Sequence, residues 1–181
     1  MNMEILNSTT ADIETIFELY DAAIAHQKAV SHLHWLPFER SLVEAEIAEG
    51  RQWKIMVEGQ IACIFVTAYS DPDIWGEKDG APSVYLHRIV THPKFRGQNF
   101  VAVIVQWAKT HGSILGKKFV RLDTWSENPR LKEHYLRCGF QFVGVITPTN
   151  FTTLPSHYAG ISLGLFEISI EEKQEKSLSQ Q

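Results

Sequence analysis

A short turn between a predicted strand and a strongly apolar helix constrains this chain most. Residues 83–90 are rich in β-branched and aromatic side chains and predict a strand. Pro93 and Gly97 punctuate the turn that follows, and apolar side chains then recur at helical spacing over residues 100–115. The first N–H groups of such a helix lack partners within it, so the turn predicts an anion site, to which Arg96 adds a permanent cation. The plainer alternative is a surface turn that only caps a buried helix.

The remaining segments alternate between strand and helix patterns. Strands are predicted at residues 4–6, 53–57, 61–67, 119–124, 140–146 and 161–170, and helices at residues 10–24, 37–50 and 128–137. Pro37 suits the first turn of the second helix, and residues 71–82 read as a loop long enough to be functional. This order indicates one layered α/β (α+β) domain over residues 1–170. Residues 171–181 lack apolar periodicity and predict a disordered tail.

Composition excludes several classes of protein. The net charge is −4 and no long basic run occurs, which argues against nucleic acid as a partner. No apolar stretch has the length of a membrane helix, and residues 1–10 do not resemble a signal peptide. The two cysteines, Cys63 and Cys138, lack metal-binding spacing and fit a reducing cytoplasm. His32 and His34 have no third ligand nearby in sequence, so we expect no metal site.

Three motifs carry a family resemblance. The turn reads Arg96-Gly97-Gln98-Asn99-Phe100-Val101, and downstream Asn128 precedes the run Tyr135-Leu136-Arg137-Cys138-Gly139-Phe140. At these spacings the segment 83–144 resembles the GNAT superfamily of N-acetyltransferases, whose diphosphate motif reads Gln/Arg-x-x-Gly-x-Gly/Ala and whose later motif reads Tyr-x-x-x-Gly-Phe. Asn99 and Val101 depart from the Gly and Gly/Ala positions of that motif. Asn tolerates left-handed backbone better than other non-glycine residues, so the turn can survive its replacement.

The resemblance implies a fold and a cofactor site. The fold would be a mixed, mostly antiparallel central sheet of about six or seven strands, with helices on both faces. Acetyl-CoA is the implied co-substrate, and no metal is implied. Backbone groups of the strand would hold the acyl carbonyl and pantetheine arm, the turn would hold the diphosphate, and an Asn would contact the pantetheine. These cofactor-binding candidates are Ile89, Val90, Thr91, Arg96, Gly97, Gln98, Asn99, Phe100, Val101 and Asn128.

The implied reaction is direct attack by a primary amine of a small molecule or peptide on the thioester. Tyr135 matches the family's general acid, which protonates the departing CoA thiolate; the alternative is a packed aromatic side chain. Many relatives carry a Glu base where this chain has Tyr85. His87 lies two residues further on, shares its strand face, and can accept a proton at neutral pH. A structural histidine, or water as the proton acceptor, remains an alternative.

The acceptor pocket is expected among large or polar side chains in or beside loops. These candidates are Trp35, Trp75, Tyr85, Arg88, Trp125, His157 and Tyr158. Asp123 and Glu127 are candidates for attracting a cationic amine, with solvated surface charge as the plainer alternative. A domain that senses acyl-CoA or another ligand without turnover is the second functional hypothesis, and a histidine-dependent metal hydrolase is the third. The oligomeric state stays open, with a homodimer among the alternatives.

Overall fold

A seven-stranded sheet runs through the middle of the computed structural model, which describes residues 2–149 and 160–170. The strand order is β1-β2-β3-β4-β5-β7-β6, and β4 and β5 form the parallel pair in an otherwise antiparallel sheet. The strands are β1 (Met3–Asn7), β2 (Gln52–Val57), β3 (Gln60–Ala68), β4 (Ser83–Thr91), β5 (Phe119–Trp125), β6 (Gln141–Ile146) and β7 (Leu163–Ser169). The predicted mixed, mostly antiparallel sheet is confirmed. The tail predicted at residues 171–181 lies outside the described residues.

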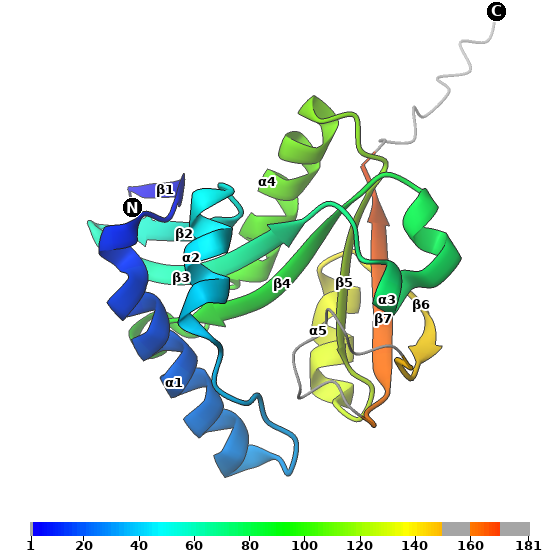
Figure 1. The fold of residues 1–181 in the computed structure, drawn as a ribbon, viewed down its shortest axis with the longest axis horizontal. Helices are drawn as coiled ribbons and strands as arrows, with labels where there is room; N and C mark the ends of the chain where they lie inside the picture. The colour runs from blue at the N-terminus through cyan, green and yellow to red at the C-terminus, as the bar shows by residue number, and fades with distance from the viewer. Residues whose placement is uncertain (1, 150–159, 171–181) are drawn as a thin grey trace, which may run out of the picture.

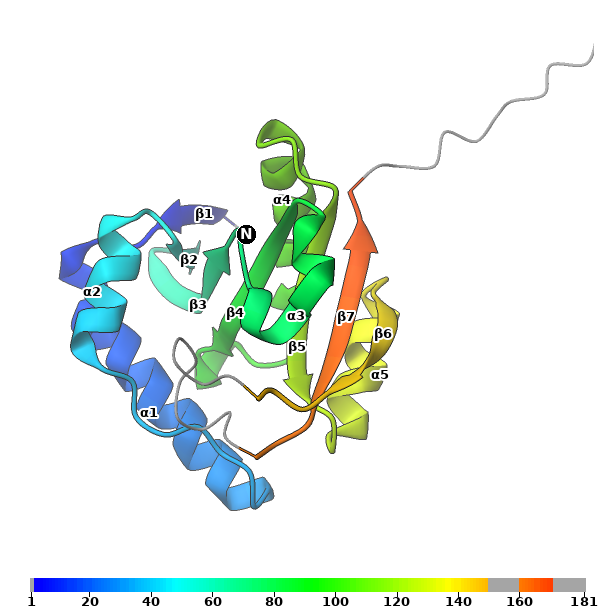
Figure 2. The same ribbon diagram turned by 45° about the vertical axis from the view of Figure 1, so that its right-hand side comes forward.

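Helices cover both faces of the sheet, as Figures 1 and 2 show. One face carries α1 (Ile13–Val30), α2 (Arg40–Ala48) and the short α3 (Pro72–Trp75), and the opposite face carries α4 (Phe100–Ile114) and α5 (Pro129–Arg137). The helices on each face pack on a different set of apolar sheet residues. Helices α4 and α5 pack on Leu86 and Leu122, whereas α1 and α2 pack on Ile64 and Val90. None of the helices in the described segments combines the length and the apolar character needed to cross a membrane.

Two local predictions were wrong. The second helix begins at Arg40, because Phe38 packs against Tyr20 and Trp35 and the chain stays extended through Glu39. The segment 71–82, expected to be an irregular loop, forms α3 and a 3-10 helix (Gly76–Gly80). Burial of Ile74 and Trp75 anchors these turns to the sheet.

Helix α4 supplies a clear test of the core. Ile104 is fully buried against the sheet, whereas Ile114, at the end of the same helix, is 79% exposed. We expect Ile104→Ala to lower the free energy of unfolding by about 3 kcal/mol, through lost burial and a residual cavity. The control Ile114→Ala should change it by less than about 0.5 kcal/mol. Urea unfolding measures both values, and equal losses would contradict this packing.

Candidate active site

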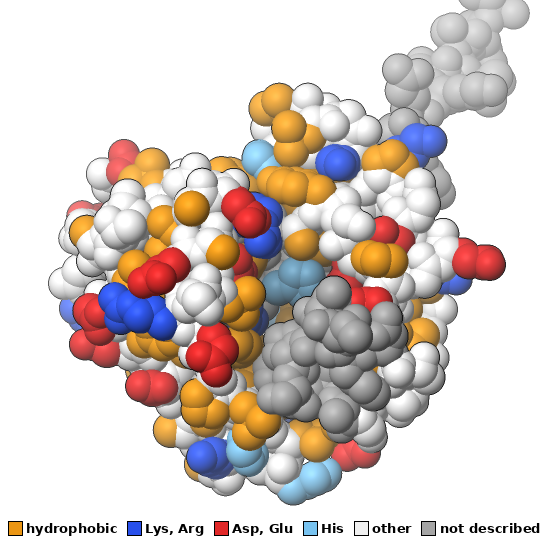
Figure 3. All heavy atoms as spheres, in the orientation of Figure 1, with side chains coloured by type: hydrophobic (Ala, Val, Ile, Leu, Met, Phe, Trp, Pro, Cys, Tyr) orange, Lys and Arg blue, Asp and Glu red, His pale blue; other side chains and the backbone are white. Residues whose placement is uncertain are grey.

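The parallel strands β4 and β5 separate part-way along their length. Their pairing runs from Ser83 opposite Phe119 to Tyr85 opposite Arg121 and stops there. Beyond this point β4 continues on β3 and β5 continues on β7, and the ribbons diverge (Figure 1). A cavity of about 1710 Å³ is lined by residues of both diverging strands and of α1 and α5. In Figure 3 the molecule is hollowed in this region, and a histidine lies in the hollow beside acidic side chains.

A bulge in β4 shapes the wall of this cavity. The register with β3 changes between His87, opposite Val66, and Val90, opposite Ile64. Two residues of β4 therefore stand opposite one residue of β3, and Arg88 takes a left-handed conformation (φ 46°). As a result, two successive side chains face the α1–α2 side: His87 contacts Asp71, and Arg88 contacts Glu46 of α2.

The predicted diphosphate turn encloses a smaller cavity of about 270 Å³ at the start of α4. Its lining includes every residue predicted for the turn and two neighbours: Thr91, Arg96, Gly97, Gln98, Asn99, Phe100, Val101 and His134. Asn99 adopts the left-handed conformation (φ 52°, ψ 48°), as expected for an Asn that replaces a motif glycine. Thr91 and Arg96 line the large cavity as well, so the two hollows adjoin.

Tyr135 and Asn128 lie on the α5 side of the large cavity. Tyr135 is 8% exposed and packs edge-on against Phe140 and Phe166. Burial, Asp123 and Cys138 raise the pKa of its phenol, which keeps the hydroxyl protonated at neutral pH. The Asn128 Oδ1 accepts a hydrogen bond from the Leu131 N–H at 3.1 Å and so caps α5. Asn128 therefore has a structural task, although it also lines the cavity.

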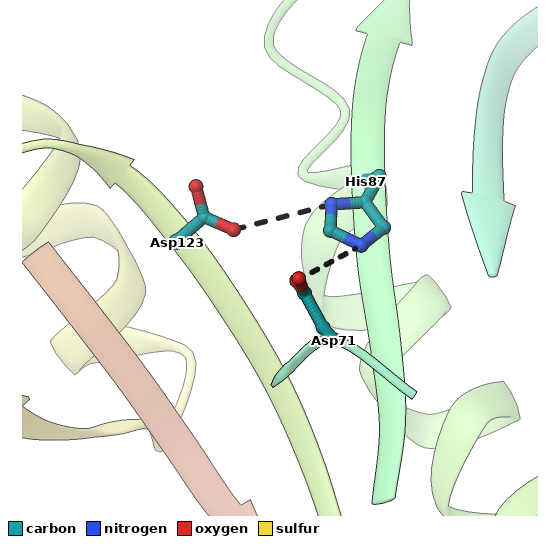
Figure 4. Close-up of side chains that lie close together, drawn as sticks. All are labelled: Asp71, His87 and Asp123. Carbon is teal, nitrogen blue, oxygen red and sulfur yellow. Dashed lines mark ion pairs between the residues drawn. The ribbon is translucent and has the colours of Figure 1, made fainter. Parts of the chain in front are cut away.

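His87 lies between two carboxylates that come from different parts of the fold (Figure 4). Its Nε2 is 3.5 Å from Asp71 Oδ2, in the segment before α3, and its Nδ1 is 3.9 Å from Asp123 Oδ1 on β5. All three residues line the large cavity. The Asp123 side chain is only 3% exposed, so the explanation of a solvated surface charge does not hold for it. Glu127, by contrast, is 66% exposed.

Burial shifts the protonation of this cluster. It lowers the pKa of His87 to about 4, reinforced by the Arg88 and Arg51 guanidinium groups. It raises the pKa of Asp71 to about 8, reinforced by the carboxylates of Asp123, Asp79 and Asp73. Near neutral pH the imidazole is therefore uncharged and can accept a proton, while Asp71 carries one.

The acceptor-pocket candidates separate into three groups. Trp35, Arg88 and Trp125 line the large cavity together with the strand residues Ile89 and Val90. Trp75 and Tyr85 do not line it; they are buried against each other, with ring centroids 5.8 Å apart. The Tyr85 hydroxyl donates to Asp79 Oδ1 at 2.5 Å, so this side chain serves the core beneath the site. His157 and Tyr158 lie outside the described residues.

Sequence reasoning did not single out Asp71 or Glu46, although both line the cavity. The only signal for Asp71 was its place at the start of a segment judged long enough to be functional. Glu46 lies on a helix among other charged residues, where sequence alone suggests a surface position. It is instead buried, and pairs with Arg88, whose guanidinium lies 4.8 Å from the Phe38 ring centroid.

His32 and His34 are not brought together with a third metal-binding group in the described parts of the chain. His32 lies 3.3 Å from Glu127, and the His34 ring nitrogen lies 2.9 Å from the Trp35 carbonyl oxygen. The three potential ligands that do converge are Asp71, His87 and Asp123.

Sequence comparison shows the family. The model of the Acetyltransferase (GNAT) family matches residues 28–140, which include the bulged strand, the diphosphate turn and Tyr135. The chain belongs to this family. An uncharacterised N-acetyltransferase of Bacillus subtilis (strain 168), YesJ, is 35% identical over 74 residues. That match covers 41% of this chain and 41% of YesJ.

Solved structures share the fold over nearly the whole chain. A GNAT-family acetyltransferase from Listeria monocytogenes 4b F2365 superposes with a TM-score of 0.74 at 22% identity, covering 92% of this chain and 94% of that one. The yncA structure from Salmonella typhimurium, which contains its cofactor acetyl-CoA, has a TM-score of 0.66 at 15% identity and covers 95% and 96% of the two chains. At these identities the likeness establishes the fold.

The protonation of Asp71 predicts a pH dependence of stability. Its pKa is higher in the folded protein than the ordinary value of 3.8, so the folded state holds a proton that the unfolded state has lost. Below about pH 6.5 the opposite shift of His87 offsets this effect. Between pH 6.5 and 8, the free energy of unfolding should fall by roughly 1.5 kcal/mol because of Asp71.

Urea unfolding at both pH values checks this expectation. Asp71→Asn cannot titrate, so the decline should disappear in the variant, whereas it should persist in Glu133→Gln, which changes an exposed acid of α5. The same fall in the free energy of unfolding in the wild type and in Asp71→Asn would show that Asp71 is not its source.

Proposed function

We propose that this protein transfers an acetyl group from acetyl-CoA to a primary amine of a small molecule or peptide. One observation carries the proposal: Arg96 of the diphosphate turn, Tyr135 and His87 line a single cavity between the diverging strands, and the rest of the turn lines the adjoining smaller cavity. A donor bound along the turn and an acceptor bound beside His87 would therefore meet inside it. Membership of the acetyltransferase family supports the same reaction.

The cofactor half of the proposal rests on the start of α4. Its free N–H groups and the Arg96 guanidinium suit the diphosphate of CoA, and the pantetheine arm would run along Ile89, Val90 and Thr91 toward the cavity centre. The yncA structure with acetyl-CoA is consistent with this use of the fold.

In the proposed reaction, one side chain serves each of the two proton transfers. The amine nitrogen attacks the thioester carbonyl carbon, and negative charge develops on the carbonyl oxygen beside the bulged strand, where backbone N–H groups can stabilise it. His87 is uncharged near neutral pH and accepts a proton from the amine. Tyr135 keeps its proton and gives it to the sulfur as the C–S bond breaks.

Turnover measurements test the role of Tyr135 as the proton donor. We expect the wild type to release thiol from acetyl-CoA in the presence of a reactive amine from a panel of alkylamines and peptides. Tyr135→Phe should lower kcat about 100-fold, because the proton donor is lost, while the Kd of acetyl-CoA stays within about two-fold. Tyr69→Phe makes the same change at a hydroxyl that bonds His111 outside the cavity, and should retain full kcat. Unchanged kcat in Tyr135→Phe would remove this phenol from the chemistry.

Measurements of ligand binding test whether the turn at Arg96 contacts the diphosphate of CoA. Arg96→Ala should weaken CoA at least ten-fold, because a charge-assisted contact to the diphosphate is lost, and should leave pantetheine, which has no phosphate, nearly unaffected. Titration calorimetry measures both. Equal losses for the two ligands would argue against a diphosphate contact. Tight CoA binding without turnover on any amine would instead favour a domain that senses acyl-CoA.

A further inference from the structure

The backbone of Arg88 has an unusual conformation for a strand residue. Its φ of 46° lies in the left-handed region, which disfavours side chains and which glycine adopts freely. The other non-glycine residues with positive φ in the described segments, Glu58 and Asn99, lie in turns between elements. Arg88 instead lies inside β4, at the bulge where two of its residues oppose one residue of β3. Contacts of the Arg88 side chain must therefore hold this conformation.

The bulge decides which layer the following residues of β4 face. In a regular strand successive side chains alternate between the two faces, so a shift of one residue reverses every later side chain. Leu86 and Ile89 both pack in the core with α4, although they are three positions apart, and Val90 packs in the core with α1. Without the bulge, Arg88 would point into the apolar layer around Leu86, and Ile89 and Val90 would exchange faces.

Three side chains hold the guanidinium of Arg88 on the α1–α2 side. It pairs with the carboxylate of Glu46 on α2, and the two side chains are only 13% and 2% exposed. Its carbon lies 5.5 Å from the ring centroid of Tyr20 on α1 and 4.8 Å from that of Phe38. The two rings pack on each other, with centroids 4.9 Å apart. Contacts between a cation and aromatic rings are stronger when they are desolvated, so this buried site fixes the guanidinium firmly.

Stability alone does not account for a buried ion pair at this position. Apolar side chains of similar volume often replace such a pair without loss of stability, because both charges must otherwise leave water. The pair adds direction instead. A carboxylate fixed on α2 selects one position for the guanidinium, and a regular strand at residue 88 would send the side chain to the α4 face. Pairing with Glu46 therefore selects the bulged backbone.

We propose that Arg88 and Glu46 are positioning residues, whose ion pair holds the bulge in β4 and thereby places His87 and the strand residues after the bulge for acetyl transfer. This inference rests on the proposed function. Arg88 acts through the backbone of β4 and does not contact the acceptor amine. Helix α2 thus contributes to the reaction through Glu46, a residue that would not touch either substrate.

Glycine and alanine at position 88 separate an effect on the backbone from an effect of the guanidinium. Both remove the charge, but the left-handed region disfavours alanine by about five- to thirty-fold relative to glycine. Each is combined with Glu46→Gln, so that no carboxylate stays buried without its partner. We expect Glu46→Gln/Arg88→Gly to keep kcat within about three-fold of the wild type and Glu46→Gln/Arg88→Ala to lower it at least about ten-fold. The KM of the amine should stay within about three-fold in both.

Two control experiments separate positioning from general stability. Glu58 is also left-handed (φ 48°) but is exposed in the turn between β2 and β3. Glu58→Gly and Glu58→Ala should therefore differ in the free energy of unfolding, measured in urea, and not in kcat. Glu44→Gln makes the same change as Glu46→Gln on the same helix, at a side chain that is 50% exposed and pairs with Arg40, and should keep full kcat.

Glu46→Gln alone gives a readout that does not depend on activity. The coupling between the amide and α protons of Arg88, measured by NMR, is smaller in the left-handed conformation than in an extended strand. We expect it to rise in Glu46→Gln, because the guanidinium loses the carboxylate that selects the bulge, and we expect kcat to fall at least about five-fold. This single variant keeps the test decisive if the alanine variant does not fold.

Four outcomes would overturn the inference. These are equal kcat in the glycine and alanine variants, an equal rise in the KM of the amine in both, an equal difference in kcat between the two Glu58 variants, and an unchanged coupling constant in Glu46→Gln. The second outcome would assign Arg88 to the acceptor pocket. Failure of the proposed function is distinct: without thiol release from any amine the enzyme assignment fails, whereas the coupling constant still shows whether Glu46 holds the bulge.

Discussion

The separation of β4 from β5 is the constraint on which the rest of the structure depends. Where the two strands part, the backbone N–H and C=O groups that face the gap lose their strand partners, while the groups on the outer sides keep theirs. Here β3 continues to pair with the outer half of β4, and β7 pairs with β5 along its whole length. The sheet can therefore open in its middle without losing its edges. Through this opening, Tyr135 from the α5 layer and His87 on the α1–α2 side reach one cavity.

The bulge in β4 depends on side chains from the layer that contains α1 and α2. A left-handed Arg88 costs about 1–2 kcal/mol, so the surrounding contacts must hold it. Its guanidinium pairs with the buried Glu46 and lies over the Tyr20 and Phe38 rings. These contacts tie β4 to α1 and α2. The same bulge turns His87 toward Asp71, so the packing of the N-terminal helices fixes the geometry of the imidazole.

The sequence predicted the features that are determined by residues close together in the chain. Periodicity located α4, and the left-handed tolerance of Asn explained how Asn99 can form the turn. The cluster around His87 could not be predicted in this way, because Asp71 and Asp123 come from segments about 50 residues apart that only the sheet brings together. Trp35 and Trp75 looked equivalent in sequence; tertiary packing places the first at the cavity and the second in the core beneath it.

The charges of the cavity explain why two substrates would not exchange places in the proposed reaction. Arg96 and the start of α4 form the positive end, which suits a diphosphate and repels an ammonium. Asp71 and Asp123 place carboxyl groups at the other end, beside His87, which offers acceptors to an amine and disfavours a phosphate. Each substrate thus has one end that favours it and one that disfavours it. The thioester and the amine nitrogen can then meet only between these ends, where His87 and Tyr135 line the opening in the sheet.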